Sequence, residues 1–322
     1  MCRLDSMRPN AEAPGFREIG KRLSNWGRWG AEDRIGTLNH ITPERLVAAG
    51  GEIRSGRLVP LGLSVRSAGV QPTPNPSGRI NPVHLISMSP ADFQDPARDG
   101  VFGVDDYIFM PLQSVTQWDG LGHIGYDELF YNGVPASSIT TRRGSTELSI
   151  DQIARRGIAG RGVLLDIARL RGVDRLAAGE DITPEDLQAA EARQGVEVGP
   201  GDIVLVRTGW LQTFFAESAN AYWNGSPGLT LDCAGWLHRR DASAVASDNW
   251  GVECFQPNAT RHPLPFHCVA IRDMGLTLGE IFVLDELGEA CEQAGRWSFF
   301  FTAPPLLVEG GVGSPITPLA IL

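Results

Sequence analysis

Short apolar runs alternate along this chain with segments that carry helix-capping signals. Residues 162–167, 202–207, 243–247 and 297–302 are rich in β-branched, aromatic and other apolar side chains, and each run is short enough to form one strand. These four runs predict strands that lie largely inside the protein.

Helices are predicted between these runs, over residues 42–50, 183–195 and 285–295. The first two open with threonine, proline and an acidic residue, which fits a hydroxyl N-cap, proline at the first helical position and the helix dipole. Asp285 is the expected cap of the third, and a glycine ends each one. Because strands and helices alternate, an α/β fold is favoured.

The chain shows no internal repeat or Gly/Ser linker, so we expect a single domain over residues 1–322. Residues 1–40 combine glycine, asparagine and tryptophan, which predicts an ordered N-terminal arm of irregular backbone. The proline- and glycine-rich stretch 71–82 is expected to be a long surface loop.

Composition and charge indicate which kinds of molecule this protein binds. The chain has a formal net charge of −10, 42% hydrophobic and 20% charged residues. Nucleic acid is excluded as a partner because binding it requires clustered positive charge. No apolar run approaches the roughly 18 residues needed to span a bilayer, and the N-terminus lacks an apolar export signal. We therefore expect a cytoplasmic protein with a small-molecule substrate and no membrane partner.

Residues 113–123 carry the most chemistry, since they contain two amides, a carboxylate and a histidine. In an extended segment Gln113, Gln117 and Asp119 would share one face and converge on one ion or substrate. Asp119 is the only anionic donor there. The alternative is that the glutamines hydrogen-bond across a sheet and that His123 is a structural histidine.

This segment resembles the motif His-x-Gly-Thr-His-x-Asp-x-Pro-x-His of the cyclase and kynurenine-formamidase family, with Thr116, Asp119 and His123 in register. Gln113 and Gln117 stand where that family has two histidine ligands. The substitution is similar to a longer-chain branch with a Thr-Gln-Trp-Asp core and a following Tyr-Asn-Gly, here at residues 131–133.

Further stretches resemble the family in the same order, at residues 36–39, 162–166, 201–210 and 247–249, so the resemblance covers nearly the whole chain. It implies an α/β fold with the swivelling β/β/α architecture, in which a mixed sheet is flanked by helices. It also implies an assembly of at least two copies, a homodimer or a homotetramer.

His267 and Glu280 resemble the second pair of metal ligands in this family. With Asp119, and with Gln113 and Gln117 completing the shell, they imply a site for a divalent metal ion, manganese or zinc. The alternatives are that His267 is a core histidine hydrogen-bonded to the backbone and that Glu280 is a surface carboxylate. Cys268 is a further candidate nucleophile only if it faces the same way as His267.

By the same resemblance His123 is the general base or acid, because a histidine can exchange a proton with water near neutral pH. Asp119 assists it, and Thr116 or backbone N–H groups are expected to stabilise an oxyanion. The expected substrate contacts are made by amide, aromatic and acidic side chains: Gln113, Gln117, Trp118, Tyr131 and Asp248.

Together these residues predict a hydrolase that opens a lactone or lactam, or cleaves an N-acyl group, by attack of a metal-activated water with His123 as general base. Two alternatives stay open. One is a metal-free cyclase, dehydratase or isomerase that uses His123 and Asp119. The other is a non-catalytic small-molecule binding protein.

Overall fold

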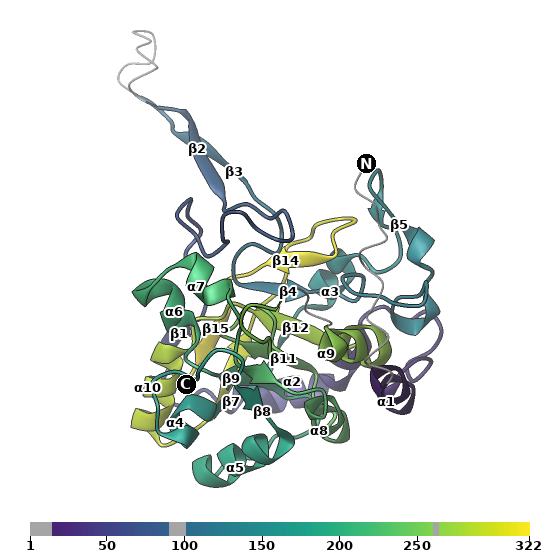
Figure 1. Ribbon diagram of the computed structural model, residues 1–322, viewed down its shortest axis with the longest axis vertical. Helices are drawn as coiled ribbons and strands as arrows, with labels where there is room; N and C mark the ends of the chain where they lie inside the picture. The colour runs from purple at the N-terminus through teal and green to yellow at the C-terminus, as the bar shows by residue number, and fades with distance from the viewer. Residues whose placement is uncertain (1–14, 90–100, 260–263) are drawn as a thin grey trace.

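The computed structural model describes residues 15–89, 101–259 and 264–322 and is built around one nine-stranded sheet (Figure 1). The first 14 residues of the predicted N-terminal arm lie outside this range. From edge to edge the strands are β1 (Leu58–Pro60), β15 (Leu319–Ile321), β13 (Ser298–Thr302), β7 (Ala159–Asp166), β9 (Ile203–Arg207), β11 (Ala244–Ser247), β12 (Thr277–Glu280), β4 (Gln117–Asp119) and β14 (Gly313–Pro315).

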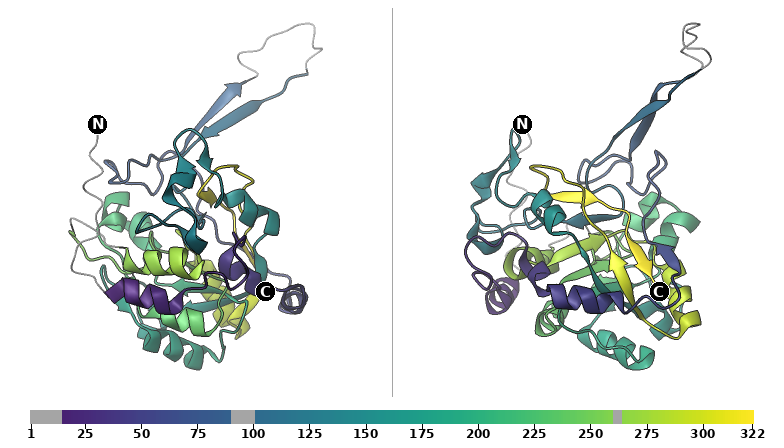
Figure 2. Two further views of the ribbon diagram at one scale, coloured as in Figure 1. Left: turned by 90° about the vertical axis from the view of Figure 1, so that its right-hand side faces the viewer. Right: turned by 180° about the vertical axis from the view of Figure 1, so that it is seen from behind.

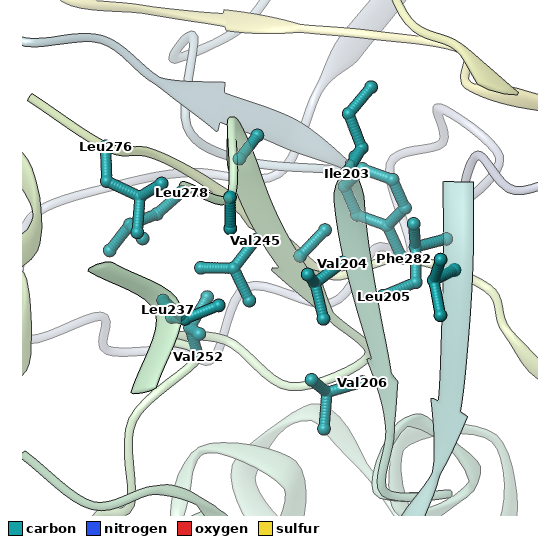
Figure 3. Close-up of a cluster of buried hydrophobic side chains, with 14 of the residues drawn as sticks. Ile203, Val204, Leu205, Val206, Leu237, Val245, Val252, Leu276, Leu278 and Phe282 are labelled. Atoms are coloured by element: carbon teal, nitrogen blue, oxygen red, sulfur yellow. The ribbon is translucent and has the colours of Figure 1, made fainter. Parts of the chain in front are cut away.

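The four central strands, β7, β9, β11 and β12, are parallel, and the strands on either side of them are antiparallel. Every residue of β9 and β11 is buried. This explains why their sequences are almost continuously apolar, because a parallel sheet is covered on both faces. Figure 3 shows their valines and leucines in one cluster with Leu237 and Phe282. The four predicted strands are confirmed as β7, β9, β11 and β13.

Helices flank this sheet, as Figures 1 and 2 show, and confirm the α/β class. They are α1 (Gly15–Leu23), α2 (Pro43–Gly50), α3 (Ile150–Arg156), α4 (Ile167–Arg171), α5 (Pro184–Gln194), α6 (Leu211–Ala216), α7 (Ala219–Trp223), α8 (Cys233–Arg239), α9 (Pro265–His267) and α10 (Asp285–Ala294). Short 3-10 turns lie at η2 (Gly36–His40), η4 (Tyr131–Gly133) and η5 (Ala136–Ser138), and a π-helix at η6 (Cys268–Met274).

The predicted caps are found on two of the three helices. Thr42 accepts a hydrogen bond from the backbone of Arg45 at the start of α2, and Thr183 forms a capping box with Asp186 at the start of α5. Asp285 was expected to cap α10, and this is wrong, because it is the first helical residue. Its carboxylate instead accepts hydrogen bonds from Arg207 and Gln212 on neighbouring segments.

The described part of the N-terminal arm packs against the π-helix η6. The side chain of Asn25 donates to the carbonyl of Met274 at 2.9 Å, and the indole of Trp26 donates to that of Arg272 at 2.7 Å. At Gly36 the backbone has a φ of +57°, and a Cβ atom would lie 2.0 Å from the carbonyl oxygen of Gly275. Only glycine allows this close approach.

Three two-stranded sheets lie outside the main sheet. They are β2 (Val83–Met88) with β3 (Asp105–Phe109), β5 (Ile139–Thr140) with β6 (Gly144–Ser145), and β8 (Asp181–Ile182) with β10 (Gly228–Leu229). The β2–β3 hairpin projects well beyond the body of the molecule (Figures 1 and 2) and was not predicted from the sequence. Within the described ranges, no helix has the length and apolar character needed to cross a membrane.

Candidate active site

Three ligand-type side chains converge next to the sheet strand β12. Ligand atoms of Asp119, His267 and Glu280 all lie within 4.8 Å of one another, and all three residues are buried. Glu280 is the last residue of a parallel strand, a position where α/β sheets commonly hold functional groups. The register pairs Glu280 with Gln117, which brings β4 beside it.

Strand β4 sends alternate side chains to opposite faces. Gln117 and Asp119 point toward Glu280, as predicted, whereas Trp118 lies on the other face against Phe282 and Phe301. Trp118 is fully buried and its indole donates to a backbone carbonyl. Its predicted role in substrate binding is therefore wrong, because the same alternation that presents Asp119 places the indole in the core.

His267 is held in position by Glu253. The Nδ1–H group donates to Oε1 of Glu253, a carboxylate that also accepts the backbone N–H groups of Phe266 and His267. The Nε2 atom then faces Glu280, 3.2 Å from Oε1. Burial opposes protonation of the imidazole, but these two carboxylates outweigh burial and raise the pKa of His267 to about 10.

Glu280 and Gln117 form the other side of the cluster. Burial, together with the charge of Asp119, raises the pKa of Glu280 to about 7. The amide nitrogen of Gln117 donates to Oε2 of Glu280 at 2.7 Å. Oε1 of Gln117 and Oδ2 of Asp119 are buried and have no hydrogen-bond partner among the described residues.

These atoms fit a divalent cation. Two carboxylates and one imidazole form a donor set that such ions accept, and two buried oxygen atoms, one each from Asp119 and Gln117, are left for a further partner. Buried polar atoms are normally satisfied, so a pair of them at one point indicates a missing ligand. Glu253 plays the part that a carboxylate often plays behind a metal-binding histidine.

His123 follows β4 in a turn and stands at the edge of this cluster. Its Nε2 atom lies 3.7 Å from Oδ1 of Asp119, and its side chain is 18% exposed, so it is the member that water reaches. Burial lowers the pKa of His123 below its usual value, and the charge of Asp119 only partly opposes this. The imidazole is therefore neutral near pH 7 and can accept a proton.

Arg79 brings a positive charge to the site, and sequence reasoning missed it. Its guanidinium donates to the backbone carbonyl of Gln113 at 3.2 Å. Its positive charge adds to the lowering of the pKa of His123 by burial, and it partly opposes the raising of the pKa of Glu280. Gln113 lies in the turn before β4, so the expectation that it shares the extended face is wrong. Its amide nitrogen is buried without a partner among the described residues, beside Gly313. Its predicted roles as a ligand and a substrate contact stay predictions.

Two predicted site residues have structural contacts instead. The Thr116 hydroxyl donates to the carbonyl of Ile281 at 2.6 Å and accepts the N–H of Leu63 at 2.7 Å, so it is already occupied. Tyr131 is buried against the N-terminal arm, where its hydroxyl donates to Asp33. The structure thus corrects the predicted substrate-binding role of Tyr131, because its buried ring and its hydroxyl are occupied by the contact with the N-terminal arm.

Asp248 follows β11, next to β12, and its carboxylate is occupied by backbone and hydroxyl donors. It accepts the backbone N–H groups of Thr208 and Gly209 and the Thr208 hydroxyl, which joins β9 to β11. Burial raises the pKa of Asp248 to about 6. Its predicted contact with substrate is therefore replaced by a capping role.

Glu253 is the other functional residue that the sequence did not reveal. It lies in a loop after β11, and no spacing or motif in the sequence connects it with His267, although the fold brings the two into hydrogen-bond contact. An acidic residue among apolar neighbours was the only signal. Cys268 does not qualify as a nucleophile, because burial raises the pKa of its thiol to about 12.

Comparison with protein families gives one match that covers more than half of the chain. The family model named Cyclase matches residues 37–254. This span contains Asp119, His123 and Glu253, whereas His267 and Glu280 lie beyond it. The ligand pair from the C-terminal part of the chain therefore depends on the geometry described above.

Known proteins agree with this match. Isatin hydrolase of Roseibium aggregatum is 32% identical over 145 residues, which is 44% of this chain and 52% of that enzyme, so the chain spans about half the length of this curated relative. A crystal structure described as a novel cyclase has 39% identity and a TM-score of 0.86, covering 93% of this chain and 100% of its own. Isatin hydrolase A of Ralstonia solanacearum has 23% identity and a TM-score of 0.61, covering 87% and 97%, and shows the same fold.

Proposed function

The chain belongs to the cyclase family, and on this premise we propose that it is a metal-dependent hydrolase that acts on a small cyclic amide or a chemically similar substrate. The finer form of the proposal is that it opens a lactam or lactone, or cleaves an N-acyl group. The named relatives that hydrolyse isatin, itself a cyclic amide, support the amide class.

The observation that carries the proposal is the convergence of Asp119, His267 and Glu280 at the end of β12. Beside them, Oδ2 of Asp119 and Oε1 of Gln117 have no hydrogen-bond partner within the part of the chain that the structure describes. A non-catalytic binding protein has no need of two buried carboxylates at one point, since each costs free energy to desolvate. A bound divalent ion would polarise the carbonyl and lower the pKa of water at this point.

His123 performs the proton transfers in this proposal. Its neutral imidazole accepts a proton from the attacking water, whose oxygen forms the new bond to the carbonyl carbon. The imidazolium is stabilised by Asp119 at 3.7 Å. It then gives the proton to the leaving nitrogen or oxygen as the C–N or C–O bond breaks. The products are an amine or alcohol group and a carboxylic acid, which releases its own proton to solvent and becomes a carboxylate.

Arg79 is assigned to the negative charge that develops on the substrate. Among the described residues its guanidinium has one hydrogen bond, to the carbonyl of Gln113, which leaves further N–H groups for an oxyanion or for the product carboxylate. Thr116 was expected in this role, but it would have to give up its hydrogen bond to Ile281 first.

A metal-free acid/base enzyme is the second candidate, and one observation favours it. Without an ion the cluster is already linked by hydrogen bonds, from Gln117 to Glu280 and from His267 to Glu253 and Glu280. In that case His123 and Asp119 would carry out a cyclisation, dehydration or isomerisation.

Elemental analysis and turnover of the same preparations test the proposal. The purified protein is compared with Asp119→Ala, His267→Ala and His123→Ala variants, and with His238→Ala as a matched control on helix α8, outside the cluster. Isatin and a panel of five- and six-membered lactams, lactones and N-acyl anilines serve as substrates, with acid release as the readout.

We expect about one tightly held divalent ion per chain, lost in the Asp119 and His267 variants. His123→Ala should keep the ion and lose turnover by at least a hundredfold, whereas His238→Ala should behave as the wild type. Full turnover in a protein stripped of metal would reject the metal-dependent mechanism in favour of the second candidate. Full turnover in a folded His123→Ala protein would reject the role of His123.

A further inference from the structure

Three apolar residues beside the candidate site have a backbone conformation that L-amino acids rarely adopt. Within the described ranges, eight residues other than glycine have a positive φ, and five of these are aspartate, glutamate or asparagine. The other three are Val252, Ile281 and Leu264, with φ values of +59°, +59° and +54°. Each lies one to three residues along the chain from a side chain that forms or supports the site, respectively Glu253, Glu280 and His267.

Val252 and Ile281 are also branched at Cβ, which makes a positive φ more costly. Such a side chain crowds the backbone, so the conformation persists only where the surrounding structure holds it. Both side chains are fully buried, and Figure 3 shows Val252 within the buried cluster. Strained residues of this kind collect at functional sites, where they fix a geometry that a relaxed chain would not keep. The contacts that hold these two turns therefore bear on the site itself.

The side chain of Asn249 holds the turn at Val252. Its Oδ1 atom accepts the N–H of Val252 at 2.6 Å and that of Gly251 at 3.3 Å. Its Nδ2 group donates to the carbonyl of Pro227 at 2.6 Å and to that of Val252 at 3.3 Å. Asn249 is fully buried, and both ends of its amide are bonded to backbone. The side chain therefore closes the turn that leads directly into Glu253.

The main chain of Asn249 holds the second turn. Its carbonyl oxygen accepts the N–H of Ile281 at 2.8 Å, and the Thr116 hydroxyl donates to the carbonyl of Ile281 at 2.6 Å. Both polar backbone groups of Ile281 are thus fixed by neighbouring segments, one residue after Glu280. Asn249 therefore contacts both strained turns, one through its side chain and the other through its main chain.

These two turns adjoin the two carboxylates that lie on either side of one imidazole. Glu253 accepts a hydrogen bond from Nδ1 of His267, and Oε1 of Glu280 lies 3.2 Å from Nε2. A carboxylate behind a metal-binding histidine fixes the orientation of the ring, and its loss weakens metal binding. Because Asn249 contacts both turns, a change at this one residue would displace both carboxylates.

We propose that Asn249 is a positioning residue of the candidate site. It holds the strained turns at Val252 and Ile281 and thereby aims the adjoining carboxylates at the two nitrogens of His267. The inference rests on the proposed function where it concerns an ion. The hydrogen bond from His267 to Glu253 is present without one, so the two can be tested separately.

Asn249→Ala is compared with Gln194→Ala, a matched control on helix α5 and outside the cluster. Gln194 is also an amide that bridges backbone groups, since it accepts the N–H of Asp166 at 3.1 Å and donates to the carbonyl of Leu164 at 2.8 Å. The first readout is the long-range ¹H–¹⁵N NMR spectrum of the histidines in the metal-free protein, in which His267→Ala identifies the signals of His267. The second is the Kd for Mn²⁺, measured by competition with a chelator.

Asn249→Ala should shift or broaden the Nδ1–H signal of His267 and raise the Kd for Mn²⁺ at least about tenfold, because the support of the imidazole is lost. Gln194→Ala should leave both unchanged, although it also loses buried hydrogen bonds and with them stability. A folded Asn249→Ala protein with the wild-type signal of His267 would overturn the inference, as would a control that changes the signal equally. If the wild type binds no Mn²⁺, the proposed function fails, and the signal of His267 still decides on Asn249.

The strain is tested separately at Val252, by urea unfolding. At an ordinary buried position alanine is more stable than glycine, because glycine loses more conformational freedom on folding. A positive φ reverses this order, so Val252→Gly should unfold at a higher urea concentration than Val252→Ala. At Val245, on strand β11, the alanine variant should be the more stable one. The same order at both positions would overturn the inference. If Asn249→Ala does not fold, Asn249→Ser takes its place, and if neither folds the order at Val252 decides.

Discussion

Replacing Glu253 by glutamine changes one atom of the carboxylate that holds His267. Oε1 accepts the imidazole Nδ1–H and the backbone N–H of His267, and Oε2 accepts the N–H of Phe266 at 3.2 Å. All of these partners are donors. The amide of glutamine must turn its NH₂ group toward at least one of them, so a hydrogen bond to a charged group becomes a contact between two donors.

The magnitude follows from this geometry. Loss of one hydrogen bond to a buried charged group costs about 1.5–3 kcal/mol. Part of this appears in the orientation of His267, whose Nε2 atom would no longer be fixed toward Glu280. Removing a carboxylate behind a metal-binding histidine typically weakens metal binding by about 10- to 100-fold, which corresponds to about 1.4–2.8 kcal/mol. The free energy of the lost hydrogen bond is therefore large enough to account for the expected loss of metal affinity. We expect the Kd for Mn²⁺ or Zn²⁺ to rise by about 10- to 100-fold.

The assay is competition for the metal with a chelator of known affinity, accompanied by urea unfolding of the metal-free proteins. Glu191→Gln is the matched control, because Glu191 is also a buried glutamate that accepts a backbone N–H, from Val198 at 2.8 Å, and pairs with Arg240 away from the cluster. The control should lose stability without losing metal affinity. If Glu253→Gln binds metal as the wild type does, with a stability loss like that of the control, the role given to Glu253 is refuted.

Three further predictions concern stability, each read from urea unfolding. Burial raises the pKa of Asp248 to about 6, so the folded form holds its proton more tightly than the unfolded form; the resulting stability, roughly 3 kcal/mol, is present below about pH 4 and lost as the pH rises through 6. Asp248→Asn should flatten this dependence between pH 4 and 7, and an unchanged slope would contradict it. Gly36→Ala should cost at least about 2 kcal/mol more than Gly27→Ala, because both have positive φ but only at Gly36 does a Cβ meet backbone, at 2.0 Å; equal losses would mean that φ alone matters. Trp118→Ala should cost about 3–5 kcal/mol, since the indole is fully buried against Phe282 and Phe301, whereas a loss under 1 kcal/mol would argue for a pocket residue.

Local signals predicted the parts of the fold that depend on neighbouring residues. The structure confirms the caps at Thr42 and Thr183 and the apolar strands β9 and β11. Each of these features depends on only a few consecutive residues. The β2–β3 hairpin was missed because its strands are separated by a long connection in the sequence and bury almost none of their side chains among the described residues.

The candidate site was predicted in part, through resemblance rather than through spacing. Asp119, His267 and Glu280 do come together, although they lie on three separate segments. Trp118 and Tyr131 were assigned to substrate because aromatic side chains suit both a pocket and a core, and only the strand direction separates the two. Glu253 and Arg79 were missed because their contacts with the site join residues that share no pattern in the sequence.

The shortness of strand β4 has a consequence for how the protein folds and opens. Three residues, paired with β12 on one side and with the edge strand β14 on the other, decide which face Asp119 occupies. A slip of one residue would turn Trp118 toward Glu280 and would turn Gln117 and Asp119 toward the apolar face that Phe282 and Phe301 occupy. The proposed ion site therefore forms only after β4, β12 and β14, which are distant in the chain, have paired at this side of the sheet. Fraying of β14 and β4 would release a bound ion while the parallel centre stayed intact, so the residence time of the metal would report local opening at this edge rather than global unfolding.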